Sequence, residues 1–239
     1  MRVLILSDIH GNYEALKTVL EKAGNVDEII VLGDLVDYGP DPDLVIDELR
    51  SLGARIVRGN HDHAVAFNTD CKCGEKTREL SILTRRKISL VKLSKTDLSL
   101  LRSLPVTLEL PLGEITIKCF HASPLDPLYD YVHPWSVNRI LETKNALNKQ
   151  KVICIGHTHL QFHVTWNGIR VINPGSTGQP RDGDWRASFA VLSIKSHGIE
   201  VNLQRVKYDV EKTVKKLKEL GLEDRSLSKL TSILLTGRV

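Results

Sequence analysis

Short apolar segments alternate with longer amphipathic segments along the first 60 residues. Residues 3–6, 28–32 and 55–57 have the length and the Val/Ile content of buried strands. Between them, residues 13–22 carry apolar side chains at helical spacing, and residues 42–52 open with a proline, which is favoured in the first turn of a helix. Strands alternating with helices predict right-handed crossovers and a largely parallel sheet.

The pattern then changes to helices and later to strands. Further helices are predicted over residues 75–93, 94–104, 136–147 and, as a pair, 209–236. Further strands are predicted over 106–110, 115–120 and 152–155, and in two hairpins, 161–166 with 169–173 and 187–194 with 199–206. Two sheets flanked by helices satisfy this pattern in a single domain of residues 1–239, with helices 209–236 packed on it.

Apolar runs and charge exclude several classes of protein. No apolar run exceeds four residues, whereas a membrane-spanning helix needs about 18. The strand at 3–6 follows Met1 too closely for a signal peptide, so we expect a cytoplasmic protein without a membrane partner. The net charge of +4 lies entirely in residues 205–239, which hold nine Lys/Arg and five Asp/Glu. A solvated helical face explains it, and no specific nucleic-acid binding is expected.

The four cysteines do not form a disulfide scaffold in a chain of this length. Cys119 and Cys154 lie in apolar strand patterns and are predicted to be small core residues. Cys71 and Cys73 lie in a polar stretch and could hold a metal or form a redox pair. Zinc sites usually need four ligands at recognised spacing, so we interpret Cys71 and Cys73 as ordinary loop residues.

Polar residues capable of catalysis or metal binding follow directly after five predicted strands. They are Asp8 and His10, Gly33-Asp34, Gly59-Asn60-His61-Asp62, His121, and Gly156-His157-Thr158-His159. In open α/β sheets, ligands bind at the carboxyl ends of the strands. The sequence therefore predicts that these five segments meet at one site.

The residue types at this site favour a pair of divalent metal ions. Carboxylate, amide oxygen and imidazole ligands, without thiolate, suit Mn, Fe, Zn and similar ions. Seven ligands are more than one ion needs, and two ions about 3.5–4 Å apart can clamp the attacking and leaving oxygens of a phosphoryl displacement. The seven predicted ligands are Asp8, His10, Asp34, Asn60, His121, His157 and His159.

The five motifs together resemble the calcineurin-like metallophosphoesterases. They occur in the family's order across residues 8–159, and Asn173-Pro-Gly-Ser176 resembles the small prokaryotic phosphodiesterase branch. The resemblance implies an α/β fold, a four-layer αββα sandwich of two mixed β-sheets flanked by helices. It also implies two divalent ions, Mn²⁺ first, with Fe, Zn, Ni or Co as alternatives.

The resemblance also implies roles for individual residues. Asp8, His10 and His159 would hold the first metal; Asn60, His121 and His157 would hold the second; Asp34 would bridge them. A water activated by the two metals would attack phosphorus. His61 would protonate the leaving group or stabilise charge, and Asp37, in a segment similar to the Gly-Asp-x-Val-Asp-Arg-Gly of the Ser/Thr phosphatases, would orient His61.

One departure from that segment affects the substrate. Tyr38 stands where the Ser/Thr phosphatases have a phosphate-clamping arginine, which argues against a protein-phosphatase function. Arg181 and Arg186, in a Gly/Pro-rich loop, could replace the clamp because guanidinium suits phosphate geometry.

The sequence thus predicts a divalent-metal-dependent phosphodiesterase acting on a nucleotide-type or other small phosphoester. A phosphomonoesterase and a dinucleoside polyphosphate hydrolase remain as alternatives. A further alternative is a non-catalytic protein-binding scaffold like the retromer subunit of this fold, but that subunit lacks the active-site histidine and this chain has His61. Homodimers are the commonest oligomers, and this frequency alone suggests one here.

Overall fold

The fold contains two five-stranded mixed sheets that face each other. The computed structural model describes residues 1–113, 115–141, 152–196 and 198–239. The first sheet has the strand order β10-β9-β1-β2-β3 and the second the order β4-β5-β6-β8-β7. The strands of the first sheet are β1 (Arg2–Leu6), β2 (Glu28–Val31), β3 (Arg55–Ile56), β9 (Ala187–Lys195) and β10 (Gly198–Val206). Those of the second are β4 (Thr107–Leu112), β5 (Ile115–Phe120), β6 (Val152–Cys154), β7 (Gln161–Trp166) and β8 (Ile169–Pro174).

Parallel strands form one side of the first sheet and the centre of the second, and antiparallel strands complete each sheet. Strands β1, β2 and β3 are parallel, and β9 runs antiparallel to both β1 and β10. In the second sheet, β5, β6 and β8 are parallel, and β4 and β7 are antiparallel edge strands. The parallel strands deliver their carboxyl ends to the same edge of the molecule, which is where ligands bind in such sheets.

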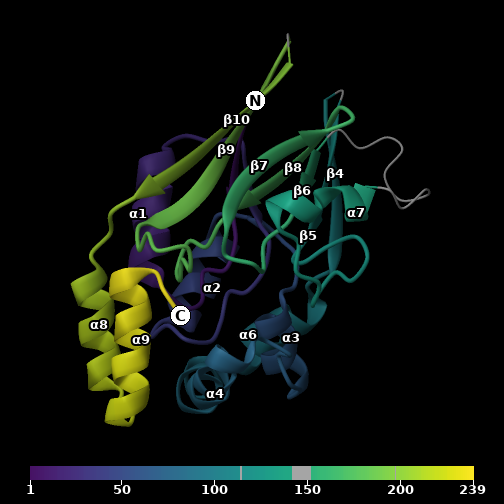
Figure 1. Ribbon diagram of the computed structural model, residues 1–239. Helices are drawn as coiled ribbons and strands as arrows, with labels where there is room; N and C mark the ends of the chain where they lie inside the picture. Colours follow the sequence, from purple (N-terminus) through teal and green to yellow (C-terminus); the bar gives the residue numbers. More distant parts are fainter. Residues whose placement is uncertain (114, 142–151, 197) are drawn as a thin grey trace.

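Helices cover the outer faces of the two sheets (Figure 1). Alternation along the strands explains the layers, because successive side chains of a strand point to opposite faces. Val3 and Ile5 of β1 pack between the sheets against Ile117 and Val152. Leu4 and Leu6 point to the other face and join the core under the helices. The result is the αββα sandwich.

Every predicted helix is present in whole or in part; among the residues it describes, the structure has one further α-helix, α3, and one predicted helix is interrupted. They are α1 (Tyr13–Ala23), α2 (Pro42–Ser51), α3 (Asn60–Phe67), α4 (Glu75–Thr84), α5 (Leu90–Lys92), α6 (Lys95–Ser103), α7 (Val137–Leu141), α8 (Val210–Glu219) and α9 (Asp224–Thr236). Helix α3 was missed by the sequence analysis, because its first four residues are polar and it therefore lacks apolar side chains at helical spacing. Of the predicted helix 136–147, residues 142–147 lie outside the described residues.

The predicted helix over 75–93 is interrupted by a π-helical turn at Arg85–Ser89. Such turns are frequent at functional sites, and here the turn places Arg85 and Ser89 against Asp37. Strand β4 continues through Pro111 to Leu112, beyond the predicted end at residue 110. The proline is tolerated because β4 is an edge strand.

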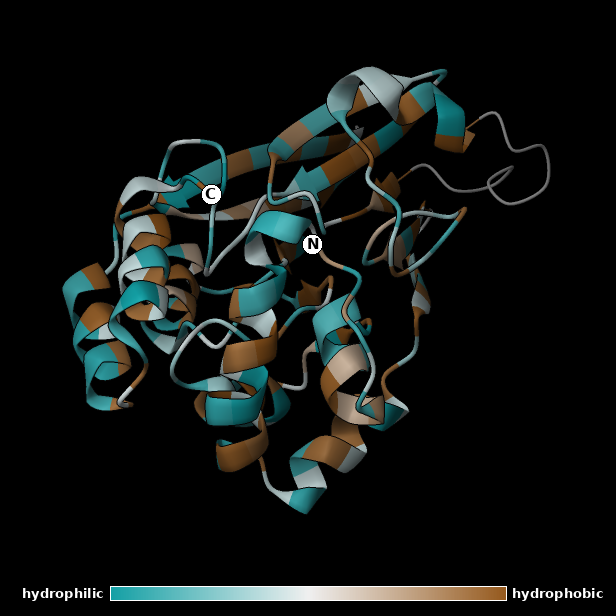
Figure 2. Ribbon diagram, turned by 60° about the horizontal axis from the view of Figure 1, so that its bottom comes forward, coloured by the Kyte–Doolittle hydropathy of each residue, from teal (hydrophilic) through white to brown (hydrophobic). Residues whose placement is uncertain are grey.

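Helices α8 and α9 lie side by side and pack against the first sheet's helical layer (Figure 1). Hydrophobic and hydrophilic residues are interleaved along both helices (Figure 2), in keeping with one face packed and one face solvated. Val214 and Leu217 of α8 and Leu230 and Ile233 of α9 belong to the same core as α1. No helix in the described ranges is long and apolar enough to cross a membrane.

Candidate active site

The predicted site residues converge at the carboxyl ends of the parallel strands of both sheets. Asp8 follows β1 and Asp34 follows β2, whereas Asn60 and His61 begin α3 just after β3. The second sheet contributes His121 directly after β5, and His157 and His159 after β6. The structure therefore brings five separate segments together, and each of these seven side chains is at most 4% exposed.

Asp8, His10 and His159 form one candidate metal-binding cluster. Their ligand atoms all lie within 4.8 Å of one another. Nε2 of His159 is 3.3 Å from Oδ1 of Asp8 and 3.3 Å from Nε2 of His10. This is the set that the family resemblance assigned to the first metal.

Asp34, His121 and His157 form a second cluster beside the first. Oδ2 of Asp34 lies 3.4 Å from Nε2 of His121, and Oδ1 of Asn60 lies 2.8 Å from the same nitrogen. Asp34 Oδ2 is also 3.8 Å from Nε2 of His10 in the first cluster. The carboxylate of Asp34 thus lies between the two clusters, where a bridging ligand would be needed.

Backbone carbonyls fix the orientation of three of the histidines. Nδ1–H of His10 donates to Val36 O at 2.9 Å, that of His121 to Leu32 O at 2.7 Å, and that of His159 to Gln179 O at 2.6 Å. Each bond leaves Nε2 as the ring nitrogen that faces the clusters. Metal-binding histidines commonly have such a partner on the other nitrogen.

Two buried atoms of the clusters have no hydrogen-bond partner: Oδ1 of Asp8 and Nε2 of His157. Unpaired buried polar atoms are costly, and an ion in the first cluster would satisfy Oδ1 of Asp8, whereas His157 turns its other ring nitrogen, Nδ1, toward Asn60 and His121 of the second cluster.

Burial lowers the pKa of His10 to about 3, and it also holds the pKa values of His157 and His159 well below the usual range. These three imidazoles are therefore neutral at pH 7, the form that binds metal. Burial also lowers the pKa of His121, but the Asp34 carboxylate outweighs it and raises the pKa to about 9, so an ion at Asp34 would take the place of that proton. The carboxylate, amide and imidazole donors present fit a pair of divalent ions.

His61 faces the clusters with one nitrogen and a carboxylate with the other. Nδ1–H of His61 donates to Asp37 Oδ2 at 2.9 Å, and Nε2 lies 4.0 Å from Asp34 Oδ2. Ser81, Ser89 and the guanidinium of Arg85 also donate to the Asp37 carboxylate. Burial alone raises the pKa of Asp37, but the His61 hydrogen bond and Arg85 outweigh it and hold the pKa below its usual value.

The backbone of the site is held in a sparsely populated conformation. Ten non-glycine residues in the described ranges have positive φ, and seven of them belong to the site: Asp8, His10, Asp34, Asp37, Tyr38, His157 and His159. Such strain costs about 1–3 kcal/mol per residue and collects at functional sites. Gly59 is required for a different reason: a Cβ there would collide with the backbone and side chain of Asp34.

Two contributors to the site were missed by the sequence analysis. The buried carboxylate of Asp62 accepts hydrogen bonds from the backbone N–H groups of Asp34, Leu35 and Gly59, and so ties the second strand end to the third. The ring of Tyr131 lies 4.3 Å from that of His157 and is 43% exposed. The Gly-Asn-His-Asp motif contained Asp62, but only the fold shows what its carboxylate holds.

The two predicted phosphate-binding arginines lie in different surroundings. The Arg181 guanidinium stands 5.7 Å from the centre of the Tyr38 ring and adds positive potential at Asp8 and His157. Arg186 forms a bidentate ion pair with Asp184 of its own loop. Its guanidinium is therefore already engaged by a carboxylate.

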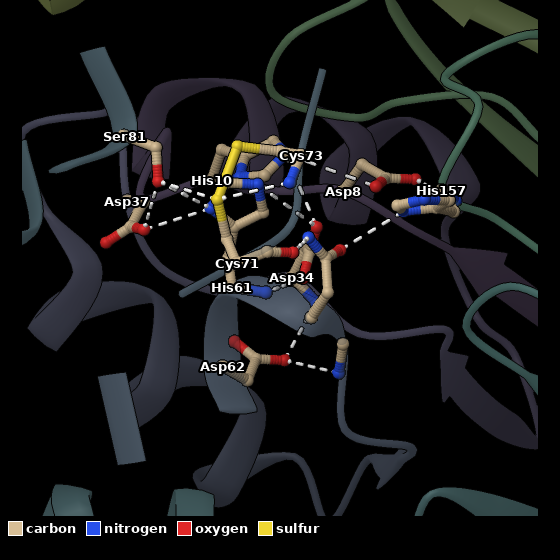
Figure 3. A network of polar contacts seen from close by, with 12 residues as sticks. Asp8, His10, Asp34, Asp37, His61, Asp62, Cys71, Cys73, Ser81 and His157 are labelled. Atoms are coloured by element: carbon tan, nitrogen blue, oxygen red, sulfur yellow. Dashed lines mark hydrogen bonds and ion pairs between the residues drawn. A yellow bond between two sulfur atoms is a disulfide. The ribbon is translucent and has the colours of Figure 1, made fainter. Parts of the chain in front are cut away.

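The interpretation of Cys71 and Cys73 as ordinary loop residues was wrong. The structure joins them in a disulfide, and both are buried beside His61. Figure 3 shows the disulfide in the same polar network as His61, Asp37 and Ser81. Cys119 and Cys154 are free and buried, as predicted.

A two-sheet sandwich with paired carboxylate and imidazole clusters at its strand ends defines the class of dinuclear-type metallophosphoesterases. Residues 1–197 match the calcineurin-like phosphoesterase superfamily domain, and the chain belongs to this superfamily. An uncharacterized protein of Methanocaldococcus jannaschii, MJ0912, is 31% identical over 233 residues, covering 90% of this chain and 91% of the relative.

Solved structures and a local match agree with this assignment. The metallophosphoesterase from Sphaerobacter thermophilus is 32% identical, with a TM-score of 0.79 over 99% of this chain and 100% of that chain. A symmetrical bis(5'-nucleosyl)-tetraphosphatase of Baumannia cicadellinicola is 43% identical over 75 residues, covering 29% of this chain and 26% of the relative.

Proposed function

We propose that this protein is a divalent-metal-dependent phosphodiesterase for nucleotide-type or other small phosphoesters. The observation that carries the proposal is the position of Asp34 between two ligand clusters, with His61 beside it. Asp8, His10 and His159 would hold one ion; Asn60, His121 and His157 would hold the other; Asp34 would bridge them. Two divalent ions supply Lewis-acid catalysis and a hydroxide nucleophile at neutral pH.

His61 is the residue placed to transfer a proton to the leaving oxygen. Its Nδ1–H donates to the ionised Asp37, which fixes the plane of the ring. Its Nε2 faces the clusters and is free to donate to an oxygen there. General acid catalysis of this kind contributes about 10²–10⁴-fold.

Arg181 is the residue placed to bind the phosphoryl oxygens. It stands over Tyr38, the residue that replaces the arginine clamp of the Ser/Thr phosphatases. Its guanidinium donates to the side-chain oxygen Oε1 of Gln179. The backbone carbonyl of Gln179 orients His159. An arginine can pair with two phosphate oxygens at once, so this guanidinium fits the clamp's role better than Arg186, which is paired with Asp184.

A hydrolase of dinucleoside polyphosphates is the second candidate. The local similarity to bis(5'-nucleosyl)-tetraphosphatases favours it. Both candidates use the same clusters and His61, and they differ in the groups that flank the reacting phosphorus. Tyr131, exposed beside His157, is available to contact such a group.

The test is hydrolysis by chelated protein before and after reloading with Mn²⁺. We expect metal-dependent turnover of bis-p-nitrophenyl phosphate and slower turnover of p-nitrophenyl phosphate. Diadenosine tetraphosphate serves as the substrate for the second candidate. If the reloaded protein leaves all three intact, the catalytic proposal fails and the protein-binding scaffold becomes the better interpretation.

A further inference from the structure

The segment between α3 and α4 carries the disulfide into the candidate active site. Residues 68–74 form neither helix nor strand, and Lys72 between the cysteines has a positive φ of 50°. Cys71 is fully buried, whereas Cys73 is 8% exposed. We call residues 68–74 the cysteine loop.

The cysteine loop holds a candidate metal ligand. The backbone carbonyl of Cys71 accepts a hydrogen bond from Nδ2 of Asn60 at 2.8 Å. This bond fixes the plane of the amide and turns its Oδ1 toward Nε2 of His121, 2.8 Å away, and Nδ1 of His157, 3.1 Å away. The position of the Cys71 backbone therefore determines where the Asn60 oxygen points.

The two sulfur atoms also contact the surroundings of His61. The hydroxyl of Ser81 lies 3.5 Å from Sγ of Cys71 and 3.2 Å from Nδ1 of His61. The hydroxyl of Tyr38 lies 3.8 Å from Sγ of Cys73. A change at the sulfurs thus reaches Asn60 through the Cys71 backbone carbonyl and His61 through the Ser81 hydroxyl.

The other two cysteines provide an internal contrast. Cys119 and Cys154 occupy paired positions on β5 and β6, where both are free thiols in the core between the sheets. They lie on strands, whereas the cysteine loop connects two helices and Cys73, at 8% exposed, is the more accessible of its two cysteines.

We propose that Cys71 and Cys73 form a reversible thiol–disulfide site that sets how tightly the Asn60 metal position binds its ion. The inference rests on the proposed function, because it concerns the same metal centre. The disulfide fixes the Cys71 carbonyl, which fixes Asn60. Reduction frees the loop and weakens that hold. In a reducing compartment, disulfides are usually transient or redox-sensing.

The oxidation is a two-step exchange with a low-molecular-weight disulfide, RSSR. The Cys73 thiolate, on the exposed side, attacks RSSR, forms a mixed disulfide and releases RS⁻. The Cys71 thiolate then attacks the Cys73 sulfur, forms the Cys71–Cys73 bond and releases a second RS⁻. The two thiol protons end on the two RSH products, so the protein loses two electrons and RSSR gains them.

The experiment compares the oxidised and reduced protein by Mn²⁺ calorimetry. The protein is oxidised with oxidised glutathione or reduced with a phosphine, and peptide mass spectrometry without reduction reports the Cys71–Cys73 bond. Changing residues that orient metal ligands typically costs 10–100-fold in metal affinity. We therefore expect reduction to raise the Kd of one of two Mn²⁺ ions about tenfold, with the other unchanged.

Two variants and a control define the cause. We expect the double variant C71S/C73S to bind Mn²⁺ like the reduced protein after either redox treatment. The single variant C73S is a milder change and should behave in the same way. C119A/C154A keeps the cysteine loop and is expected to respond like the wild type. Circular dichroism verifies that each variant is folded.

The outcomes separate this inference from the proposed function. Failure to form the Cys71–Cys73 bond under oxidation, or equal Mn²⁺ binding in both redox states, overturns the inference even if bis-p-nitrophenyl phosphate is hydrolysed. A redox-dependent Kd without hydrolysis of any substrate supports the inference and removes the phosphodiesterase assignment instead.

Discussion

At the residue scale, the site depends on side chains that occupy costly backbone conformations. Asp8, His10 and Asp34 all have positive φ, which is uncommon for residues other than glycine. The surrounding hydrogen bonds stabilise these conformations: Asp62 accepts from the N–H of Asp34, and Ser176 donates to the carbonyl of Asp8. The ligands are therefore preorganised, so a bound ion need not reorder the chain.

His61→Ala tests the assignment of the proton donor. The change removes the group that faces Asp34 but none of the seven candidate ligands, so we expect turnover to fall by about 10²–10⁴-fold with Mn²⁺ binding retained. Steady-state kinetics and calorimetry measure the two quantities. His63→Ala, on the same helix and packed against Phe67, is the matched control. Full activity in H61A would show that another group protonates the leaving oxygen.

Tyr131→Ala tests whether the exposed ring beside His157 contacts the substrate. We expect KM for a dinucleotide substrate to rise about tenfold with kcat little changed, because a lost aromatic stacking contact is worth about 1–3 kcal/mol. Trp135→Ala is the control, since Trp135 is more exposed and stacks on His133. Equal KM values in Y131A and wild type would remove Tyr131 from the substrate site.

At the element scale, one lysine of helix α8 pairs with carboxylates of both α1 and the start of α2. Nζ of Lys216 donates to Glu14 on α1 and to Asp41 at the start of α2, both at 2.8 Å. Lys212 adds a second ion pair to Glu14. Both carboxylates are buried, so these contacts are worth more than an exposed surface pair.

Lys216→Met is expected to destabilise the protein by about 1–2 kcal/mol at pH 7, as judged by urea unfolding. Burial raises the pKa of Glu14, but the hydrogen bonds from Lys216 and Lys212 outweigh it and lower the pKa. A carboxyl group whose pKa is lower in the folded state stabilises the folded protein at pH values above its unfolded-state pKa, about 4.3. This stabilisation is lost as the pH falls through the folded-state pKa. The deficit of K216M should therefore shrink below about pH 4.

The control for this prediction is Lys218→Met, which removes an exposed lysine from the same helix. The free energy of unfolding of K218M should match that of the wild type at pH 7 and at pH 3. A K216M deficit that is constant between pH 7 and pH 3 would show that lost packing, not the ion pairs, accounts for it.

Elements with strong periodic patterns could be predicted from sequence, and elements shaped by distant contacts could not. Strand β1 and helix α1 follow directly from their apolar spacing. The interruption of the helix at Arg85–Ser89 depends on Asp37, nearly 50 residues earlier, because Arg85 and Ser89 both donate to its carboxylate. The bonded sulfurs of Cys71 and Cys73 likewise depend on a loop path that no local pattern encodes.

The candidate ligands were accessible to sequence reasoning because each directly follows a predicted strand. Parallel strands bring such positions to one edge, whatever the details of packing. What the pattern could not supply is geometry: the position of Asp34 between the clusters, the hydrogen bonds that Asp62 accepts, and the place of Arg181 over Tyr38. Each of these depends on contacts between segments that are far apart in the sequence.

At the scale of the whole molecule, the candidate metal ligands come from both sheets. The first sheet supplies Asp8 and Asp34, and the second supplies His121 and His157. Ions bound by these residues would link the sheets and would bind the folded chain in preference to the unfolded chain, so metal binding would add to folding stability. A ligand that binds only the folded state at 100 times its Kd stabilises it by about 2.7 kcal/mol.

Mn²⁺ is therefore expected to raise the Tm of the chelated protein by about 5–10 °C for each ion at that saturation, since about 1 kcal/mol shifts Tm by about 2–4 °C at this chain length. Differential scanning calorimetry of chelated and reloaded protein measures the shift. Asp34→Asn keeps the shape of the bridging side chain and removes its charge, so the Mn²⁺-dependent rise should nearly vanish. An equal rise in D34N would place the ions elsewhere, because both clusters depend on the Asp34 carboxylate lying between them.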